Sequence, residues 1–179
     1  MYENYKARRI THIQLDKLAN PCYNTKVSQR KGESIMRLSY FKHARNAMLK
    51  SDYHGAGSSP RIGVVAEYKG AIIAEAWNTD KTSVLQNKYN RLRFHNPALP
   101  AKNHAETNLC QRIRWKFGDS LDWSRVHLYL YRELKNGSLA MSRPCHACMA
   151  MLRDFGIEQV YYTTENGYAQ ERIKGKEEI

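Results

Sequence analysis

The sequence lacks a long apolar run, and this absence excludes one class of protein. Its longest apolar stretches, such as residues 71–74, are a handful of residues long. A helix that spans a bilayer needs about 20 apolar residues, so we predict no transmembrane helix. The first ten residues are polar and contain no apolar core of a secretory signal. We therefore expect a cytoplasmic location and no membrane partner.

Acidic residues are scarce relative to basic ones. The chain has 17 Asp and Glu against 29 Lys and Arg, for a net charge of +12. The first 50 residues alone hold 11 basic and 3 acidic side chains. A field of this sign attracts phosphates, whether on nucleic acid or on free nucleotides. A solvated basic surface is the alternative, and composition leaves both open.

Cysteine is also scarce, with four residues at positions 22, 110, 145 and 148. A chain of 179 residues can bury a core without disulfides. With no export signal, the close pair Cys145 and Cys148 indicates metal binding or redox activity before it indicates a disulfide. Cys110 is expected to be a small buried core residue.

Periodicity divides the chain into an arm, one domain and a tail. Residues 1–32 predict a basic arm with little regular structure, 33–173 a catalytic domain, and 174–179 a frayed end. Helical spacing predicts helices over 33–51, 104–118 and 144–156, and alternation predicts strands near 62–66, 71–74, 126–131, 159–164 and 168–173. Residues 78–103 predict a long loop with at most one helical turn. The order αββαβαββ indicates an α/β fold with helices against one central sheet.

Two short motifs carry the candidate chemistry. His104-Ala105-Glu106 and Pro144-Cys145-His146-Ala147-Cys148 each open a predicted helix. Cys145 and Cys148 lie three residues apart, which places both sulfurs on one face of a first turn, where thiolates are favoured. If His104 lies nearby, zinc gains three protein ligands, and an open fourth position is typical of a catalytic zinc.

The open position would hold water, whose pKa zinc lowers toward about 7. Glu106, two residues after His104, can line the same pocket without binding the metal. It is suited to move protons between that water and a substrate nitrogen. The other interpretations of these cysteines are a structural zinc or a redox-active dithiol. A second metal site using Cys22 with His12 or His54 is a further alternative, and His95 is a candidate pocket residue.

The two motifs together resemble the zinc-dependent cytidine and deoxycytidylate deaminase superfamily, over roughly residues 33 to 173. The resemblance implies a three-layer fold with a mixed five-stranded sheet and helices on both faces. It implies one zinc per chain, bound by His104, Cys145 and Cys148, and it makes Glu106 the acid and base. It also implies substrate contacts from the Asn78 side chain and the Ala105 backbone amide.

The resemblance leaves the substrate subgroup open. An Asn two residues after Glu106, here Asn108, is similar to the motif of deoxycytidylate deaminases. The sequence Ser142-Arg143-Pro144-Cys145 resembles the corresponding motif of viral and phage members. In contrast, Asn166-Gly167 predicts an antiparallel hairpin between the last two strands, as in free-cytidine deaminases. Deoxycytidylate and polynucleotide-editing members place a helix there and run those strands parallel. The stretches 80–103 and 134–141 are longer than is typical of the family and would flank the pocket mouth.

The sequence therefore predicts a hydrolytic deaminase that converts a cytosine base of a nucleoside or nucleotide to uracil and releases ammonia. The alternative is a polynucleotide deaminase acting on tRNA or single-stranded DNA, which the basic arm with Tyr2, Tyr5 and Tyr23 favours. A deaminase fold kept only for binding is a third hypothesis, which the intact ligands and Glu106 oppose. We also expect a homo-oligomer, in which the arm could pack.

Overall fold

The computed structural model describes residues 37–51, 60–91 and 102–173. Its elements, in chain order, are α1 (Leu38–Leu49), β1 (Gly63–Tyr68), β2 (Ala71–Trp77), β3 (Thr79–Thr82), α2 (Val84–Asn90), β4 (Lys102–Asn103), α3 (Ala105–Phe117), the 3-10 helix η2 (Trp123–Arg125), β5 (Val126–Tyr131), α4 (His146–Phe155), β6 (Gln159–Thr164) and β7 (Gly167–Arg172). None of the helices in these ranges is long and apolar enough to cross a membrane.

Five strands form the central sheet, in the order β2-β1-β5-β6-β7. Only β5 and β6 pair in parallel, while the other neighbours are antiparallel, so the sheet is mixed as predicted. Lys69 and Gly70 close the β1–β2 hairpin with positive φ angles of 52° and 86°. Two positive φ angles at the turn match the right-handed twist of paired strands, which favours this connection.

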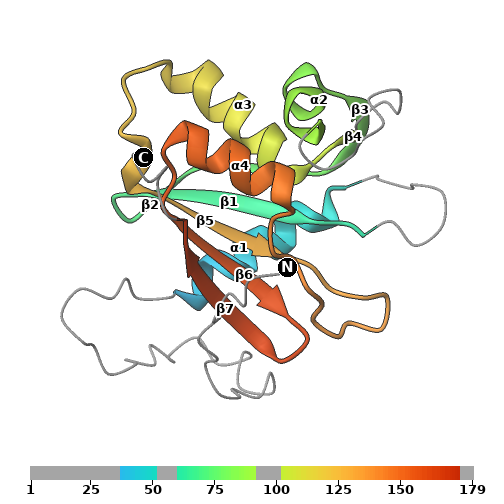
Figure 1. Ribbon diagram of the computed structural model, residues 1–179. Helices are drawn as coiled ribbons and strands as arrows, with labels where there is room; N and C mark the ends of the chain where they lie inside the picture. Colours follow the sequence, from blue (N-terminus) through green and yellow to red (C-terminus); the bar gives the residue numbers. More distant parts are fainter. Residues whose placement is uncertain (1–36, 52–59, 92–101, 174–179) are drawn as a thin grey trace, which may run out of the picture.

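Alternate residues of the central strands face opposite layers, because side chains in a strand point to opposite faces. Val64, Leu128 and Leu130 are fully buried on the face that carries α3 and α4. Val65, Tyr129 and Tyr161 are buried on the face that carries α1. Helices therefore cover both faces of the sheet, as Figure 1 shows with α1 on one side and α3 and α4 on the other.

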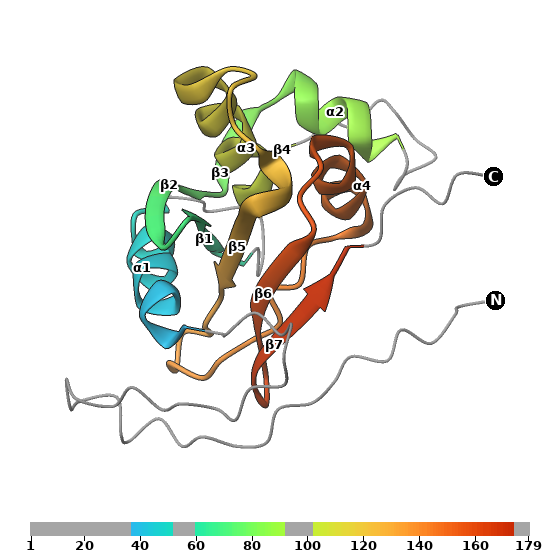
Figure 2. The same ribbon diagram turned by 90° about the vertical axis from the view of Figure 1, so that its left-hand side faces the viewer.

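The helix α1 lies directly against β1, with no side chain between the two backbones at Gly63. A Cβ atom at Gly63 would overlap with the carbonyl oxygen of Ala44 and the amide nitrogen of Met48. The 90° view in Figure 2 shows α1 flat against the sheet on the side away from α4. Glycine at position 63 thus sets the separation between these two layers.

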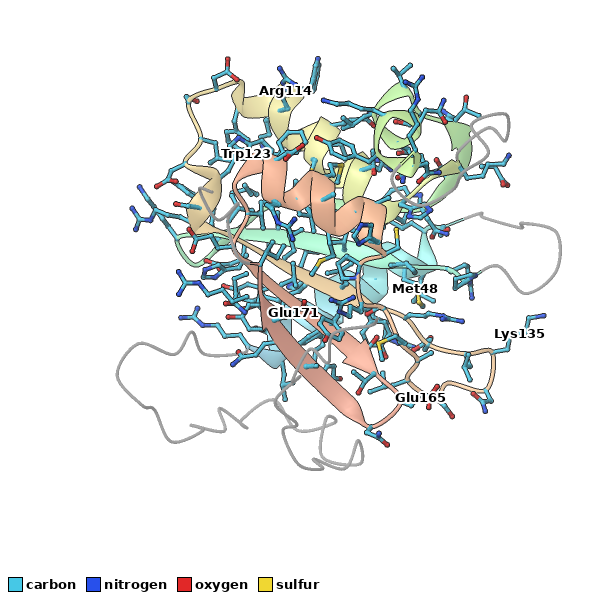
Figure 3. All side chains as sticks on the ribbon, viewed as in Figure 1. Met48, Arg114, Trp123, Lys135, Glu165 and Glu171 are labelled. Carbon is cyan, nitrogen blue, oxygen red and sulfur yellow. The ribbon has the colours of Figure 1, made fainter. Side chains whose placement is uncertain are left out.

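The last two strands form an antiparallel hairpin, which confirms the sequence prediction. Residues from Gln159↔Arg172 to Thr164↔Gly167 pair in regular register. Only Glu165 and Asn166 lie between the strands, so no helix separates them. Figure 3 shows Glu165 at the tip of this hairpin.

The predicted loop over 78–103 is wrong in its described part. Residues 79–82 form β3, 84–90 form α2, and 102–103 form β4, which pairs with β3. The short helix α2 has little apolar periodicity, and its stability comes from a capping serine and from contacts with neighbouring helices. The arm 1–32, the tail 174–179, Cys22, His12, His54 and His95 lie outside the described residues, so those predictions and the expected oligomer stay predictions.

Candidate metal centre and active site

Three predicted ligands meet where α3 and α4 begin. His104 is the N-cap of α3, Cys145 is the N-cap of α4, and Cys148 lies in the first turn of α4. The His104 Nδ1 atom is 3.6 Å from Cys145 Sγ and 3.4 Å from Cys148 Sγ. All three ligand atoms lie within 4.8 Å of one another. They form the one cluster of three or more candidate ligands found among the described residues.

These separations fit a zinc ion. Tetrahedral zinc with Zn–S bonds of about 2.3 Å and a Zn–N bond of about 2.1 Å would place the nitrogen about 3.6 Å from each sulfur. The observed distances of 3.4 and 3.6 Å agree with that geometry. One imidazole and two thiolates also suit zinc chemically and leave its fourth position open.

The two thiols interact closely, and this interaction separates their pKa values. Hydrogen bonding from Cys148, together with His104, lowers the pKa of Cys145 to about 3. The Cys145 side chain and burial raise the pKa of Cys148. One thiolate therefore forms readily, and a bound cation would displace the second proton, because metal ligands must be deprotonated.

Glu106 lies in the first turn of α3, beside the ligand cluster. Its side chain is buried, with 3% of the residue exposed. Burial raises the pKa of Glu106, and the nearby His104 partly opposes that effect. A buried carboxyl with a raised pKa is suited to both accept and release a proton during a reaction.

Ala105 is buried at the first position of α3, directly between His104 and Glu106. Backbone N–H groups in the first turn have no carbonyl partner within their helix. The Ala105 amide is therefore a hydrogen-bond donor located beside the ligand cluster. This position is compatible with the substrate contact that the sequence resemblance implies.

Asn78, which follows β2, is buried and holds two segments of chain together. Its Oδ1 atom accepts hydrogen bonds from the Ile62 amide at 2.8 Å and the Ser51 hydroxyl at 3.3 Å. Its Nδ2 atom donates to the Pro60 carbonyl at 2.8 Å. An amide nitrogen carries two hydrogens, and the Pro60 carbonyl takes one of them.

Buried polar contacts fix the segment that leads into Cys145. The Ser142 hydroxyl donates to the Leu130 carbonyl at 3.0 Å and accepts from the Thr163 amide at 2.9 Å. These bonds tie the approach of α4 to both strands of the parallel pair. The longer excursion that precedes it, residues 132–141, carries Lys135 outward at its tip (Figure 3).

Cys110 and two further histidines in the described ranges lie outside the ligand cluster. Cys110 is fully buried in the core, as predicted, and burial raises the pKa of its thiol. His146 is exposed on α4, and His127 Nδ1 lies 2.9 Å from Glu67 Oε2. A hollow of about 510 Å³ lies elsewhere, between α2, α3 and α4, and its lining residues include none of the ligand cluster.

Sequence reasoning missed Gln86 on α2, whose side chain contacts the start of α3. The Gln86 Oε1 atom accepts from the His104 amide at 3.3 Å. A signal was present, because Ser83-Val84-Leu85-Gln86 is a Ser-x-x-Gln sequence of the kind that begins helices. Residues 78–103 are mostly polar, and this composition led to the prediction of a loop instead of a helix.

Comparisons with known proteins agree with this geometry. The family described as "Cytidine and deoxycytidylate deaminase zinc-binding region" matches residues 37–164. A search of curated proteins finds no match. A cytidine deaminase from Burkholderia pseudomallei is similar in structure, with 12% identity, a TM-score of 0.53, and coverage of 78% of this chain and 94% of that chain.

A dCMP deaminase from the cyanophage S-TIM5 is similar as well. Its apo form has 24% identity and a TM-score of 0.45, covering 70% of this chain and 79% of that chain. Its complex with dCMP and dUMP has 22% identity and a TM-score of 0.45, covering 70% and 78%.

The family match spans all but the last strand of the described fold. Together with a His/Cys/Cys cluster of zinc-compatible geometry, it makes the protein a zinc-dependent hydrolytic deaminase. The chain belongs to the cytidine and deoxycytidylate deaminase family.

Proposed function

We propose that this protein deaminates the cytosine base of a cytidine or deoxycytidine nucleoside or nucleotide, giving uracil and ammonia. In this proposal His104, Cys145 and Cys148 hold the zinc ion. The observation that carries it is the buried Glu106 carboxyl beside a three-ligand cluster whose separations suit zinc. A structural zinc would have four protein ligands, whereas this cluster has three among the residues that the structure describes.

When bound, zinc supplies a Lewis acid that makes hydroxide available at neutral pH. Glu106 then does the proton work of the reaction. It takes one proton from the attacking water and delivers it to N3 of the base as the new C4–O bond forms. It then moves the remaining hydroxyl proton to the amino group, so that the C4–N bond breaks, ammonia leaves and the C4 carbonyl forms.

The raised pKa of Glu106 supports this role, because the same group must both accept and donate protons at one pH. Its burial also keeps bulk water from competing for those protons. The Ala105 amide donates to the carbonyl of the base, and the second amide hydrogen of Asn78 contacts the base or the sugar. The rest of the Asn78 side chain is fixed by Ile62 and Pro60, which fits a preformed contact.

The β6–β7 hairpin favours a small substrate over a polynucleotide. By the sequence resemblance, polynucleotide-editing members place a helix between these strands, and here the connection is two residues long. An Asn two residues after the Glu of the motif, here Asn108, is a feature shared with deoxycytidylate deaminases. In this protein the Asn108 Nδ2 atom donates to the Trp77 carbonyl at 3.0 Å, which is a structural contact. We therefore keep nucleosides and nucleotides as one substrate class.

The test is ammonia release by the zinc-loaded protein with cytidine, deoxycytidine, dCMP, dCTP, adenosine and short oligonucleotides. We expect turnover of at least one free cytosine nucleoside or nucleotide. Glu106→Gln is the matched control, because it preserves shape and removes the carboxylate. It should retain zinc and lose at least about 10⁴-fold in rate. Turnover of adenosine or oligonucleotides alone would contradict the proposed substrate class.

A further inference from the structure

Gln86 is a buried polar residue that the proposed chemistry does not use. It lies on α2, and 1% of the residue is exposed. Its Oε1 atom accepts two hydrogen bonds from the start of α3, one from the His104 amide at 3.3 Å and a short one from the Thr107 hydroxyl. Its Nε2 atom donates to Asn90 Oδ1 at 2.9 Å. All three bonds agree on the orientation of the amide, since a flipped group would direct its hydrogens at the His104 amide.

The local sequence makes these contacts unexpected. In a capping box, the first residue accepts from the backbone amide three positions later, and the side chain at that position returns a bond to the cap. Ser83 does accept from the Gln86 amide, at 3.3 Å. The Gln86 side chain does not return a bond to Ser83, and its Oε1 atom bonds to the start of α3 instead. Only the Ser83 half of the capping box is therefore formed in α2.

The helix α3 lacks the caps that most helices have. Its N-cap residue is His104, which makes no side-chain capping bond because its ring is turned toward the two sulfurs. Its third residue is Thr107, which in a capping box would be a Glu or Gln reaching back to the N-cap amide. Gln86 fills the second gap from outside the helix, since it accepts from the His104 amide, and it also accepts from the Thr107 hydroxyl.

We propose that Gln86 is a positioning residue of the metal centre, which holds the His104 backbone so that Nδ1 faces Cys145 and Cys148. This inference rests on the metal site proposed above. The His104 ring faces the sulfurs and makes no capping bond, and Gln86 holds the same residue by its backbone amide. Partners that orient ligands from outside the metal's first shell typically change metal affinity or activity by about 10- to 100-fold.

The position of α2 does not depend on Gln86 alone, so the two roles can be separated. The Tyr89 hydroxyl donates to Asp154 Oδ2 on α4 at 2.9 Å. Gln111 on α3 donates to the Ser83 hydroxyl at 3.1 Å. Tyr89→Phe therefore weakens the docking of the same helix without touching the start of α3, and it is the matched control.

The experiment compares wild type, Gln86→Met, Gln86→Glu and Tyr89→Phe. Methionine keeps the length and removes the acceptor, whereas glutamate keeps an acceptor oxygen for both donors. The measurements are zinc affinity by chelator competition, the visible spectrum of the cobalt(II)-substituted protein, which reports ligand geometry, and the melting temperature of each variant.

We expect Gln86→Met to weaken zinc binding by about 10- to 100-fold and to shift the cobalt spectrum. Gln86→Glu should recover most of both, and Tyr89→Phe should lower the melting temperature while leaving affinity and spectrum unchanged. Wild-type affinity and spectrum in Gln86→Met would overturn the proposal, as would equal losses in Tyr89→Phe or no recovery in Gln86→Glu. Failure of the metal site itself would look different, because wild type would then bind no zinc through His104.

Discussion

Arg143 binds Glu171 through two parallel hydrogen bonds. The Nε–Oε2 and Nη2–Oε1 distances are both 2.7 Å. Arg143 lies two residues before Cys145, and Glu171 lies on the edge strand β7, as labelled in Figure 3. The pair thus connects the segment that delivers a metal ligand to the far edge of the sheet.

We predict that Arg143→Gln lowers the free energy of unfolding by about 1 kcal/mol, because a two-pronged pair is stronger than a typical surface pair. Arg143→Lys should recover only part, since an ammonium group cannot make the second parallel bond. Urea unfolding provides the measurement. Arg172→Gln is the control, because Arg172 and its partner Glu158 are 76% and 47% exposed. Equal losses in the two Gln variants would show that the geometry of the Arg143 pair adds nothing.

Cys148→Ala should remove stoichiometric zinc, because the remaining histidine and Cys145 form an incomplete site. Metal analysis of the purified variant measures this directly. Cys110→Ala should keep one zinc per chain, because Cys110 lies in the core and outside the ligand cluster. Removing zinc from wild type by chelation should also lower its melting temperature, since the ligands come from two helices. Full zinc occupancy in Cys148→Ala would contradict the ligand assignment.

Alkaline stability should depend on Tyr89. Burial and the hydrogen bond to Asp154 raise the pKa of Tyr89 to about 12, whereas an unfolded tyrosine ionises near about 10. The folded state therefore favours the neutral phenol, so this stabilisation is complete below about pH 10 and is lost as the pH rises toward about 12.

In that window the free energy of unfolding of the wild type falls as the pH rises. Tyr89→Phe should make this fall less steep, by an amount that corresponds to the uptake or release of up to about one proton. The measurement is urea unfolding at a series of pH values from neutral to alkaline. Burial also raises the pKa of Tyr129 and Tyr131, and these residues remain in the variant, so the slope should decrease without vanishing. An unchanged slope would contradict the assigned shift.

Gly63→Ala should destabilise the protein by about 3 kcal/mol, because the added methyl group meets backbone atoms of α1 that cannot move aside. Gly137→Ala is the control, because an added methyl group at position 137 meets no other atoms. The strain of that substitution comes from the backbone alone, which has a positive φ of 83°. It should cost about 1 kcal/mol. Chemical unfolding of both variants gives the comparison, and a Gly63→Ala loss no larger than that of Gly137→Ala would show that the layers separate easily.

Much of the fold was predictable because its signals are local. The alternation of Val126, Leu128 and Leu130 and the turn at Asn166 and Gly167 define strands without knowledge of the rest of the chain. The helix α2 was not predictable in this way, because its buried residues Gln86 and Tyr89 are polar or amphipathic and bond to other helices.

The candidate site was predictable in residue type and not in geometry. Residue spacing placed Cys145 and Cys148 on one turn, but it could not bring His104 to them across 41 residues. That association came from the family resemblance and is visible in the structure as adjacent helix starts. The contacts of Gln86 were beyond sequence reasoning, because they join elements that the sequence separates by 18 and 21 residues.

The single parallel pair, β5 with β6, has a consequence for the order of assembly. Because parallel neighbours need a crossover, α4 must pass over the sheet and settle beside α3 before its cysteines reach His104. A nascent chain that has emerged only as far as β5 offers one ligand of the three. All three ligands are present together only once the chain has been made through the first turn of α4, before β6 and β7 have been added to the sheet.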